Sequence, residues 1–407
     1  MTTIALASNT SERLGWSALP LVVCYLLVPA PMILTLVAGV PPLRIAFDVA
    51  LAGVAAIALL AIAASGRLRL FESADLAVIL GGLALATFAA RVVAAYATGD
   101  VELGFAALEI KPLFYVVVAL LCLLAFGPPT PEVFVRCGSW LGMLLAAECI
   151  VRSVTTGVLT RAVGTAEVNY DAALLVLSLC FALSQPRRWR WHILGIFVGL
   201  LATMSRTSLA AALLIVLFTS RLSVPVKFMA LVFGLASAAF SFTSRGQSLG
   251  DISTLDRVWM WIVGIELLAD HPVELLFGFP IGHALPVGQI PAPIQWIWEG
   301  LLKADASGSV FPFHFHGFWL RSVMTWGLLA TVAAIAALLL PVYRRDRVLA
   351  LRLTLFLLIE GLTMGLFYLS NVAVPLLLSF SVVTVSVVRH RSVSASEPLG
   401  ARELKRA

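Results

Sequence analysis

Charged residues are scarce in this sequence. Of its 407 residues, 12% are Asp, Glu, Lys or Arg and 60% are hydrophobic, and the mean hydropathy is +1.00. A soluble globular protein carries about 25% charged residues, because its surface must be hydrated. This shortage of charge excludes the soluble fold classes and indicates an integral membrane protein.

Cysteine is also scarce, and the common nucleotide and metal signatures are missing. The five cysteines lie in or at the ends of apolar segments, at positions 24, 122, 137, 149 and 180. They suggest neither a disulfide framework nor a thiolate metal site. The sequence contains no internal repeat, no Walker sequence, no metalloprotease motif and no DxD signature. We therefore expect a chain that uses no metal ion and no cofactor.

Long apolar runs recur along the chain. A bilayer core takes about 20 apolar residues per helix, and such runs are ended here by charge, Pro or Gly. The predicted fold class is all-α, a polytopic helix bundle with about twelve transmembrane helices. The expected spans are 19–39, 45–64, 76–97, 113–126, 133–151, 172–183, 191–202, 208–218, 228–242, 318–340, 353–369 and 372–388. The two beside Ser205 and Arg206 have only about 12 apolar residues each, which predicts short, tilted or re-entrant helices.

The basic residues set the orientation. With a cytoplasmic N-terminus, Arg67, Arg136, the cluster at 187–190, the run at 344–352 and the tail at 389–407 all lie inside, as the positive-inside rule requires. Both termini are then cytoplasmic. The excess of positive charge reports contact with anionic lipid headgroups rather than nucleic-acid binding.

One connection is much longer than the rest. It divides the chain into an N-terminal membrane part of about nine spans (1–242), a large external loop (243–315), C-terminal membrane helices (316–388) and a basic cytoplasmic tail (389–407). Within the loop, 255–269 predicts an amphipathic helix with Trp259 and Trp261 at the membrane interface, and 294–302 predicts a second interfacial segment. Long loops of this kind are usually functional.

Two external arginines are candidate anion-binding groups. Arg206 opens a span between Ser205 and Thr207, where free helix N–H groups and a guanidinium together suit an oxyanion; the alternative is an arginine that reaches toward headgroups. Arg257 lies on the amphipathic loop helix beside Asp256. Taken alone, it is better explained as an exposed helical charge.

Two histidines stand just before the span at 318–340. Either His314 or His316 could accept a proton near neutral pH, because imidazole titrates there. The loop also contains His271 and His283, so a metal site is an alternative. The i, i+2 spacing of the first pair, without a carboxylate at ligand spacing, argues against it.

Other ionisable residues lie within or beside the spans. Arg91, Glu148 and Glu360 either lock the bundle as interhelical ion pairs or form a polar path for a solute, and we favour the pairing. Arg161, Lys303 and Arg321 are external cations that bind either a sugar phosphate or lipid headgroups, and we favour headgroups.

Three features in order resemble a known family. They are Ser-Arg-Thr at the start of a span (205–207), Arg-x-x-x-Trp early in the external loop (Arg257 to Trp261), and a His before an aromatic span that reaches Trp-Gly-Leu-Leu (316–329). This arrangement is similar to the O-antigen ligase and Wzy-type polymerase superfamily of bacterial membrane glycosyltransferases. The likeness covers about residues 204–329. Members often have Asn after the His, where this chain has Gly317.

The resemblance implies an enzyme. It implies metal-independent, inverting transfer of a glycan from an undecaprenyl-diphosphate-linked donor to an acceptor hydroxyl, on a glycan or on lipid A-core, at the periplasmic face of the bacterial inner membrane. Arg206 and Arg257 would bind the diphosphate and His316 would activate the acceptor. His314, Trp261, Arg91 and Arg321 are further candidate substrate-binding residues, and polysaccharide assembly or export proteins are candidate partners.

The sequence is also compatible with two rival functions. A transporter or flippase for an anionic solute would depend on Arg91, Glu148 and Glu360 within the membrane. A non-catalytic scaffold of a polysaccharide export complex would show no transfer from any lipid-linked donor. Ligase and polymerase differ only in their acceptor, so the sequence leaves that choice open, together with the sugars, their linkage and the oligomeric state.

Overall fold

The computed structural model of the chain describes residues 15–38, 45–65, 75–99, 101–165, 167–220, 223–225, 227–228, 231–232, 256–285 and 310–382. Within these ranges the chain is helical, and the single β-type contact is an isolated bridge between Leu285 and Val310. Most of the expected span at 228–242, the predicted interfacial segment at 294–302, Lys303 and the basic tail lie outside the described residues.

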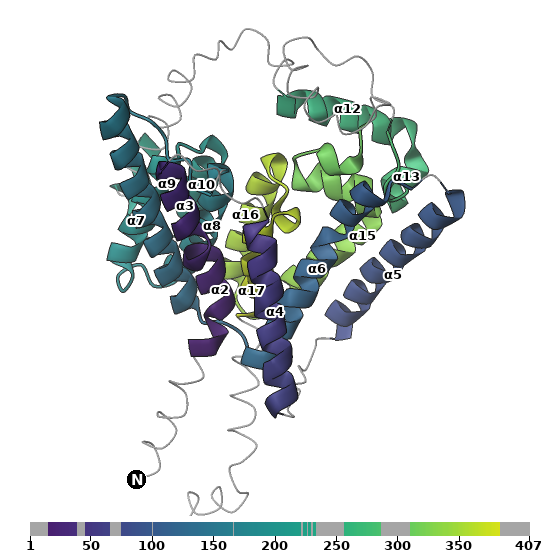
Figure 1. Cartoon of the computed structure of the whole chain (residues 1–407), viewed down its shortest axis with the longest axis horizontal. Helices are drawn as coiled ribbons and strands as arrows, with labels where there is room; N and C mark the ends of the chain where they lie inside the picture. The colour runs from purple at the N-terminus through teal and green to yellow at the C-terminus, as the bar shows by residue number, and fades with distance from the viewer. Residues whose placement is uncertain are drawn as a thin grey trace, which may run out of the picture.

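The described helices form a bundle, and one helix, α12 (Asp256–Asp270), lies across an end of it (Figure 1). In chain order they are α2 (Leu19–Val22), the π-helical η1 (Val23–Leu27), α3 (Pro29–Val37), α4 (Ala46–Ser65), α5 (Asp75–Thr98), α6 (Leu103–Phe126), α7 (Pro131–Thr156), α8 (Val168–Ala182), α9 (Arg190–Thr203), α10 (Arg206–Thr219), α12 (Asp256–Asp270), α13 (Pro272–Phe277), the 3-10 turn η3 (Pro312–His314), α15 (Phe318–Tyr343), α16 (Arg347–Thr363), the 3-10 turn η4 (Leu366–Tyr368) and α17 (Ser370–Ser381).

Five of these helices are long and apolar enough to cross a bilayer. They are Ala46–Ala64 in α4, Leu80–Ala97 in α5, Leu103–Phe126 in α6, Pro131–Thr156 in α7 and Phe318–Tyr343 in α15. Several others are apolar but shorter, including α8, α9, α10 and α17. The described residues are therefore all-helical and include five helices able to span a membrane, whereas the number of twelve spans stays a prediction.

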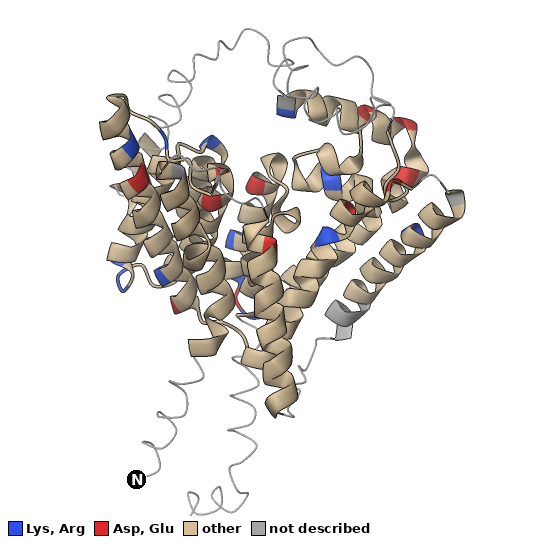
Figure 2. Ribbon diagram, in the orientation of Figure 1, with Lys and Arg blue, Asp and Glu red and all other residues tan. Residues whose placement is uncertain are grey.

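The bundle is built from a few closely packed pairs of helices. The helix α7 packs against α8 and α9, α4 against α6, α10 against α16, and α15 against both α5 and α16. The loop helix α12 lies across one end of the bundle (Figure 1), and it spans nearly the residues that the amphipathic pattern predicted, 255–269. Charged residues are sparse on the bundle, and many of its acidic residues lie in the half nearest α12 (Figure 2).

A buried arginine joins the helices at the other end. The side chain of Arg352 on α16 donates from Nη1 to the Cys180 carbonyl at 3.0 Å and from Nη2 to the Leu183 carbonyl at 3.2 Å. It also donates from Nε to the Thr219 hydroxyl at 3.0 Å and from Nη2 to the Thr219 carbonyl at 3.3 Å. The last carbonyls of a helix have no partner within the helix. Arg352, which the sequence places in a cytoplasmic basic run, is 4% exposed and binds the carbonyls at the ends of α8 and α10.

Two buried carboxylates hold the connection between α7 and α8. Glu148 accepts hydrogen bonds from the backbone N–H groups of Val163 at 2.8 Å and Gly164 at 3.0 Å. Asp171 accepts from the Thr165 N–H at 2.8 Å and from its hydroxyl. Carboxylates that receive several hydrogen bonds tolerate burial. This connection is therefore fixed against the bundle rather than loose.

Candidate functional site

The C-terminal end of α16 is a meeting point of elements far apart in the sequence. Its free carbonyls need donors. The Trp261 indole N–H of α12 donates to the Leu362 carbonyl at 2.9 Å, and the Phe318 N–H of α15 donates to the Met364 carbonyl at 2.8 Å. The Thr363 and Thr207 hydroxyls are 3.2 Å apart, which brings the start of α10 to the same place.

Each predicted catalytic residue lies next to one of these contacts. Arg206 is the first residue of α10 and directly precedes Thr207. Arg257 is one helical turn before Trp261 on α12, which is about 6 Å along the axis. His316 is followed by Gly317, where a Cβ atom would lie 2.8 Å from the Leu362 carbonyl oxygen. The structure therefore brings all three elements to one end of α16.

A buried carboxylate belongs to this meeting point. Glu360, one turn before the end of α16, is 0% exposed, and Ser208 of α10 lies beside it without a hydrogen bond of regular geometry. Arg257 is close enough to interact electrostatically with Glu360 and with Tyr170 of α8. The acid expected as an interhelical partner thus faces the arginine of the loop helix.

The two histidines have different surroundings. His316 is exposed, in the segment between η3 and α15. His314 is 5% exposed, and its Nδ1 accepts a hydrogen bond from the Phe311 N–H at 3.0 Å. The His314 ring packs against Phe105 and Phe313, with centroids 5.4 and 4.9 Å apart. His316 is therefore the accessible imidazole, and His314 stabilises the turn before α15.

Arg321 differs from its expected place. It is 7% exposed rather than in contact with headgroups, and its guanidinium lies 3.9 Å from the centroid of the Tyr368 ring and 4.9 Å from that of Phe313. Both distances are typical of cation–π interactions, and such interactions partly compensate the cost of burying the charge. At Gly365, a Cβ atom would lie 3.4 Å from Arg321 Nη1 and 3.7 Å from the His316 carbonyl oxygen. Arg321 is thus adjacent to the predicted catalytic histidine.

Arg91 is buried in a second group of charges beside Arg321. It is 5% exposed, and none of its three guanidinium nitrogens has a hydrogen-bond partner among the described residues. Glu109 of α6 is its electrostatic neighbour and also that of Arg321. One Glu109 oxygen accepts from the Gly282 N–H at 3.3 Å, and the other has no partner in the described part of the chain.

A break in α15 shapes this region. Gly327 has φ +75°, outside the helical range, and the loop after α13 crosses at this point. The Phe279 N–H donates to the Met324 carbonyl, at 2.7 Å, just before the break. Gly278 also has positive φ, and a Cβ atom there would lie 2.7 Å from the Gly327 nitrogen and 2.8 Å from Arg91 Cζ. Only glycine fits both positions without strain.

The remaining predicted residues lie elsewhere. Glu148 is bound by loop N–H groups, with Arg152 at 3.8 Å, and shares no contact with Arg91 or Glu360. Arg161 is exposed. Trp261 is half-buried and joins α12 to α16 through its indole N–H, so its placement has a structural reason. In the residues that the structure places, no three His, Cys, Asp or Glu side chains gather as metal ligands do.

Sequence reasoning missed Glu109 and Tyr368. The expected span began at 113, yet α6 begins at Leu103 and includes Pro112. An apolar run extended across Pro112 would have placed Glu109 within the span. Tyr368 carries no charge, and nothing in its sequence neighbourhood indicates that Arg321 stacks on it.

Comparison with protein families, with curated proteins and with solved structures finds no match for this chain.

Proposed function

We propose that this chain is a membrane glycosyltransferase that transfers a glycan from a polyprenyl-diphosphate donor to an acceptor hydroxyl. The supporting observation is that the elements carrying Arg206, Arg257 and the exposed His316 meet at the C-terminal end of α16. Two guanidinium groups and one imidazole on three separate elements are an unusual group to assemble on an apolar bundle. The family resemblance of residues 204–329 agrees with this proposal.

The chemistry follows from these groups. A diphosphate leaves with growing negative charge, and Arg206 and Arg257 neutralise that charge with bidentate hydrogen bonds. His316, as a neutral imidazole, takes the proton of the attacking hydroxyl, a step worth typically about 10²- to 10⁴-fold. Direct displacement inverts the anomeric carbon. Glu360 positions Arg257 electrostatically from within the bundle.

The proposal includes a setting in the cell. It places about twelve spans in a bacterial inner membrane, both termini in the cytoplasm, and α12 with the end of α16 on the periplasmic side. The transporter alternative gains no observation of its own, because Glu148, Arg91 and Glu360 contact different partners.

The test is in-vitro transfer. Purified full-length protein in nanodiscs is mixed with undecaprenyl-diphosphate glycans and candidate acceptors in the presence of EDTA, and initial rates of product formation are measured. Arg206→Ala, Arg257→Ala and His316→Ala each lower the rate at least 100-fold. Arg188→Ala, which removes an exposed arginine in the connection between α8 and α9, is the matched control and keeps the wild-type rate.

Two results would contradict the proposal. One is a rate that depends on added divalent metal, because the arginines would then not suffice for the leaving group. The other is wild-type transfer by all three variants. Loss of anion flux into liposomes on replacing Glu148, with transfer absent, would favour the transporter instead.

A further inference from the structure

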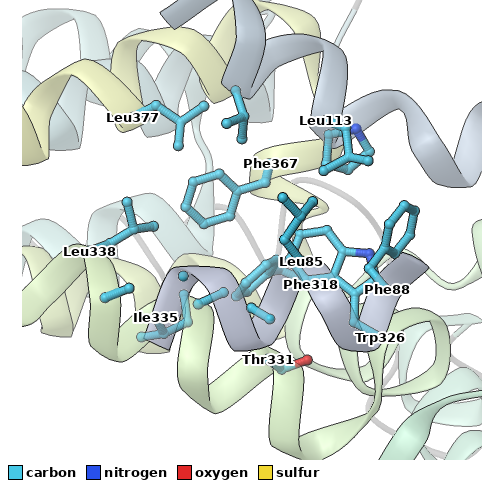
Figure 3. Close-up of a pocket in the computed structure, with 16 residues that line it drawn as sticks. Leu85, Phe88, Leu113, Phe318, Trp326, Thr331, Ile335, Leu338, Phe367 and Leu377 are labelled. Carbon is cyan, nitrogen blue, oxygen red and sulfur yellow. The ribbon is translucent and has the colours of Figure 1, made fainter. Parts of the chain in front are cut away.

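A pocket of about 260 Å³ lies between α5, α6, α15 and α17, with η4 at its edge. Its walls are almost entirely apolar and include Leu85, Phe88, Leu338, Phe367 and Leu377 (Figure 3). This volume is just below the range of about 300 to 1,000 Å³ for sites that take drug-sized molecules. The pocket therefore suits part of a slender hydrocarbon chain and is too small and too apolar for a glycan.

One end of this pocket borders the buried charges. Phe88 lines the pocket, and Arg91 follows it by one turn on the same face of α5, about 4.5 Å along the axis. Phe367 lines the pocket, and Tyr368, which stacks on Arg321, is the next residue. Trp326 packs edge-on to Phe88, with centroids 6.3 Å apart, at the same level.

The charges at this end are not balanced. Two buried guanidinium groups, Arg91 and Arg321, face one carboxylate, Glu109. All three Arg91 nitrogens, Arg321 Nε and the indole nitrogen of Trp326 are buried without a hydrogen-bond acceptor among the described residues. A buried donor without an acceptor costs about 1 to 3 kcal/mol, and more when it is charged. An anionic group at this position would supply the missing acceptors and the missing negative charge.

An apolar pocket beside guanidinium groups that lack hydrogen-bond acceptors suits a ligand with a hydrocarbon chain and an anionic head group. We infer that this pocket binds the hydrocarbon chain of a polyprenyl phosphate, with its phosphate beside Arg91 and Arg321. This inference rests on the proposed function for the choice of a polyprenyl chain over a phospholipid acyl chain, which shares the same chemistry. The Arg321 guanidinium and the His316 carbonyl both lie beside Gly365, just after the end of α16, so a head group held by Arg321 is near that end.

The experiment measures binding without any transfer. Purified full-length protein is titrated with undecaprenyl monophosphate, and the bound lipid is measured by native mass spectrometry. Ala84→Phe and Ala334→Leu each add bulk to a residue that lines the pocket, from α5 and α15 respectively, and each weakens binding at least tenfold. Ala86→Phe, on an exposed position of α5 that does not line the pocket, is the matched control and binds as the wild type does.

A second comparison tests the charges. The wild type binds undecaprenyl monophosphate at least tenfold more tightly than undecaprenol, and Arg91→Gln removes most of this difference because the phosphate loses a guanidinium partner. Size-exclusion chromatography of each variant checks that the fold is retained. Equal binding by the wild type and both filled-pocket variants overturns the assignment, as does an equal affinity for the phosphate and the alcohol.

Competition between lipids distinguishes a polyprenyl chain from a phospholipid acyl chain. Phosphatidylglycerol at tenfold excess leaves undecaprenyl monophosphate bound; complete displacement overturns the choice of a polyprenyl chain. Because no sugar is transferred here, binding that persists in a protein inactive in transfer contradicts only the proposed function. Transfer that needs Arg206 in a protein whose pocket binds no lipid contradicts only the pocket.

Discussion

Replacing Arg352 tests how the bundle is held together at the end opposite α12. In Arg352→Met the apolar stem is roughly conserved, and the guanidinium that binds the ends of α8 and α10 is lost. The carbonyls of Cys180, Leu183 and Thr219 then lose their shared donor. In Arg352→Lys a charge remains, but a single ammonium cannot reach all of these oxygens at once.

The magnitude follows from four hydrogen bonds of a buried cation. Hydrogen bonds to charged groups contribute about 1.5 to 3 kcal/mol each in soluble proteins. In membrane proteins the measured average is about 0.6 kcal/mol, because the unfolded chain finds other partners in lipid. We expect Arg352→Met to lower the free energy of unfolding by about 2.5 to 4 kcal/mol, between the sums that these two values give for four bonds, and Arg352→Lys to lower it by about half as much.

Reversible unfolding in mixed micelles, with SDS as denaturant and tryptophan fluorescence as readout, measures this difference. Arg188→Met is a suitable control, because Arg188 is exposed and its ion pair with Glu132 is solvated. The reasoning is refuted if Arg352→Met unfolds at the wild-type SDS fraction, or if the Lys variant is the less stable of the two.

Three further predictions concern the loop contacts. Gly327→Ala forces a side chain into a positive-φ position against the Leu276 carbonyl and lowers the unfolding free energy by about 1 to 3 kcal/mol in the same assay, whereas Gly82→Ala, in open space, does not; equal stability would disprove the strain. Trp261→Phe removes the hydrogen bond to Leu362, misplaces Arg257 and slows transfer roughly 5- to 10-fold, and an unchanged rate would show that this bond does not position α12. Glu148→Gln weakens the hold on the connection at 157–165, which limited proteolysis detects as faster cleavage there; an unchanged cleavage rate would show that the carboxylate does not fix it.

Much of the architecture could be predicted from the sequence, because hydropathy depends on local composition. The amphipathic segment at 255–269 forms α12, and the short apolar runs beside Ser205 and Arg206 form the 14-residue helices α9 and α10. The convergence at α16 was anticipated only through the family resemblance. No local pattern indicates that the Trp261 indole reaches Leu362.

The surroundings of the buried charges could not be predicted from local sequence. Arg321 follows an aromatic segment and was expected at the headgroups, whereas Tyr368 of a later segment folds over it. Gly327 belongs to the Trp-Gly-Leu-Leu motif. The motif does not indicate that the backbone at Gly278 lies against Gly327, where α15 departs from helical geometry. Both features depend on contacts between distant segments, and those are set by tertiary packing.

The shortness of α9 and α10 has a consequence for the surrounding lipid. Each has 14 residues and is about 21 Å long, several ångströms less than a hydrocarbon core of roughly 30 Å. Their exposed apolar side chains include Leu194, Val198 and Phe218. As the predicted spans, helices this short would thin the bilayer beside them. Under the proposed function, that thinning would bring the phosphate plane of one leaflet toward Arg206 in the first turn of α10.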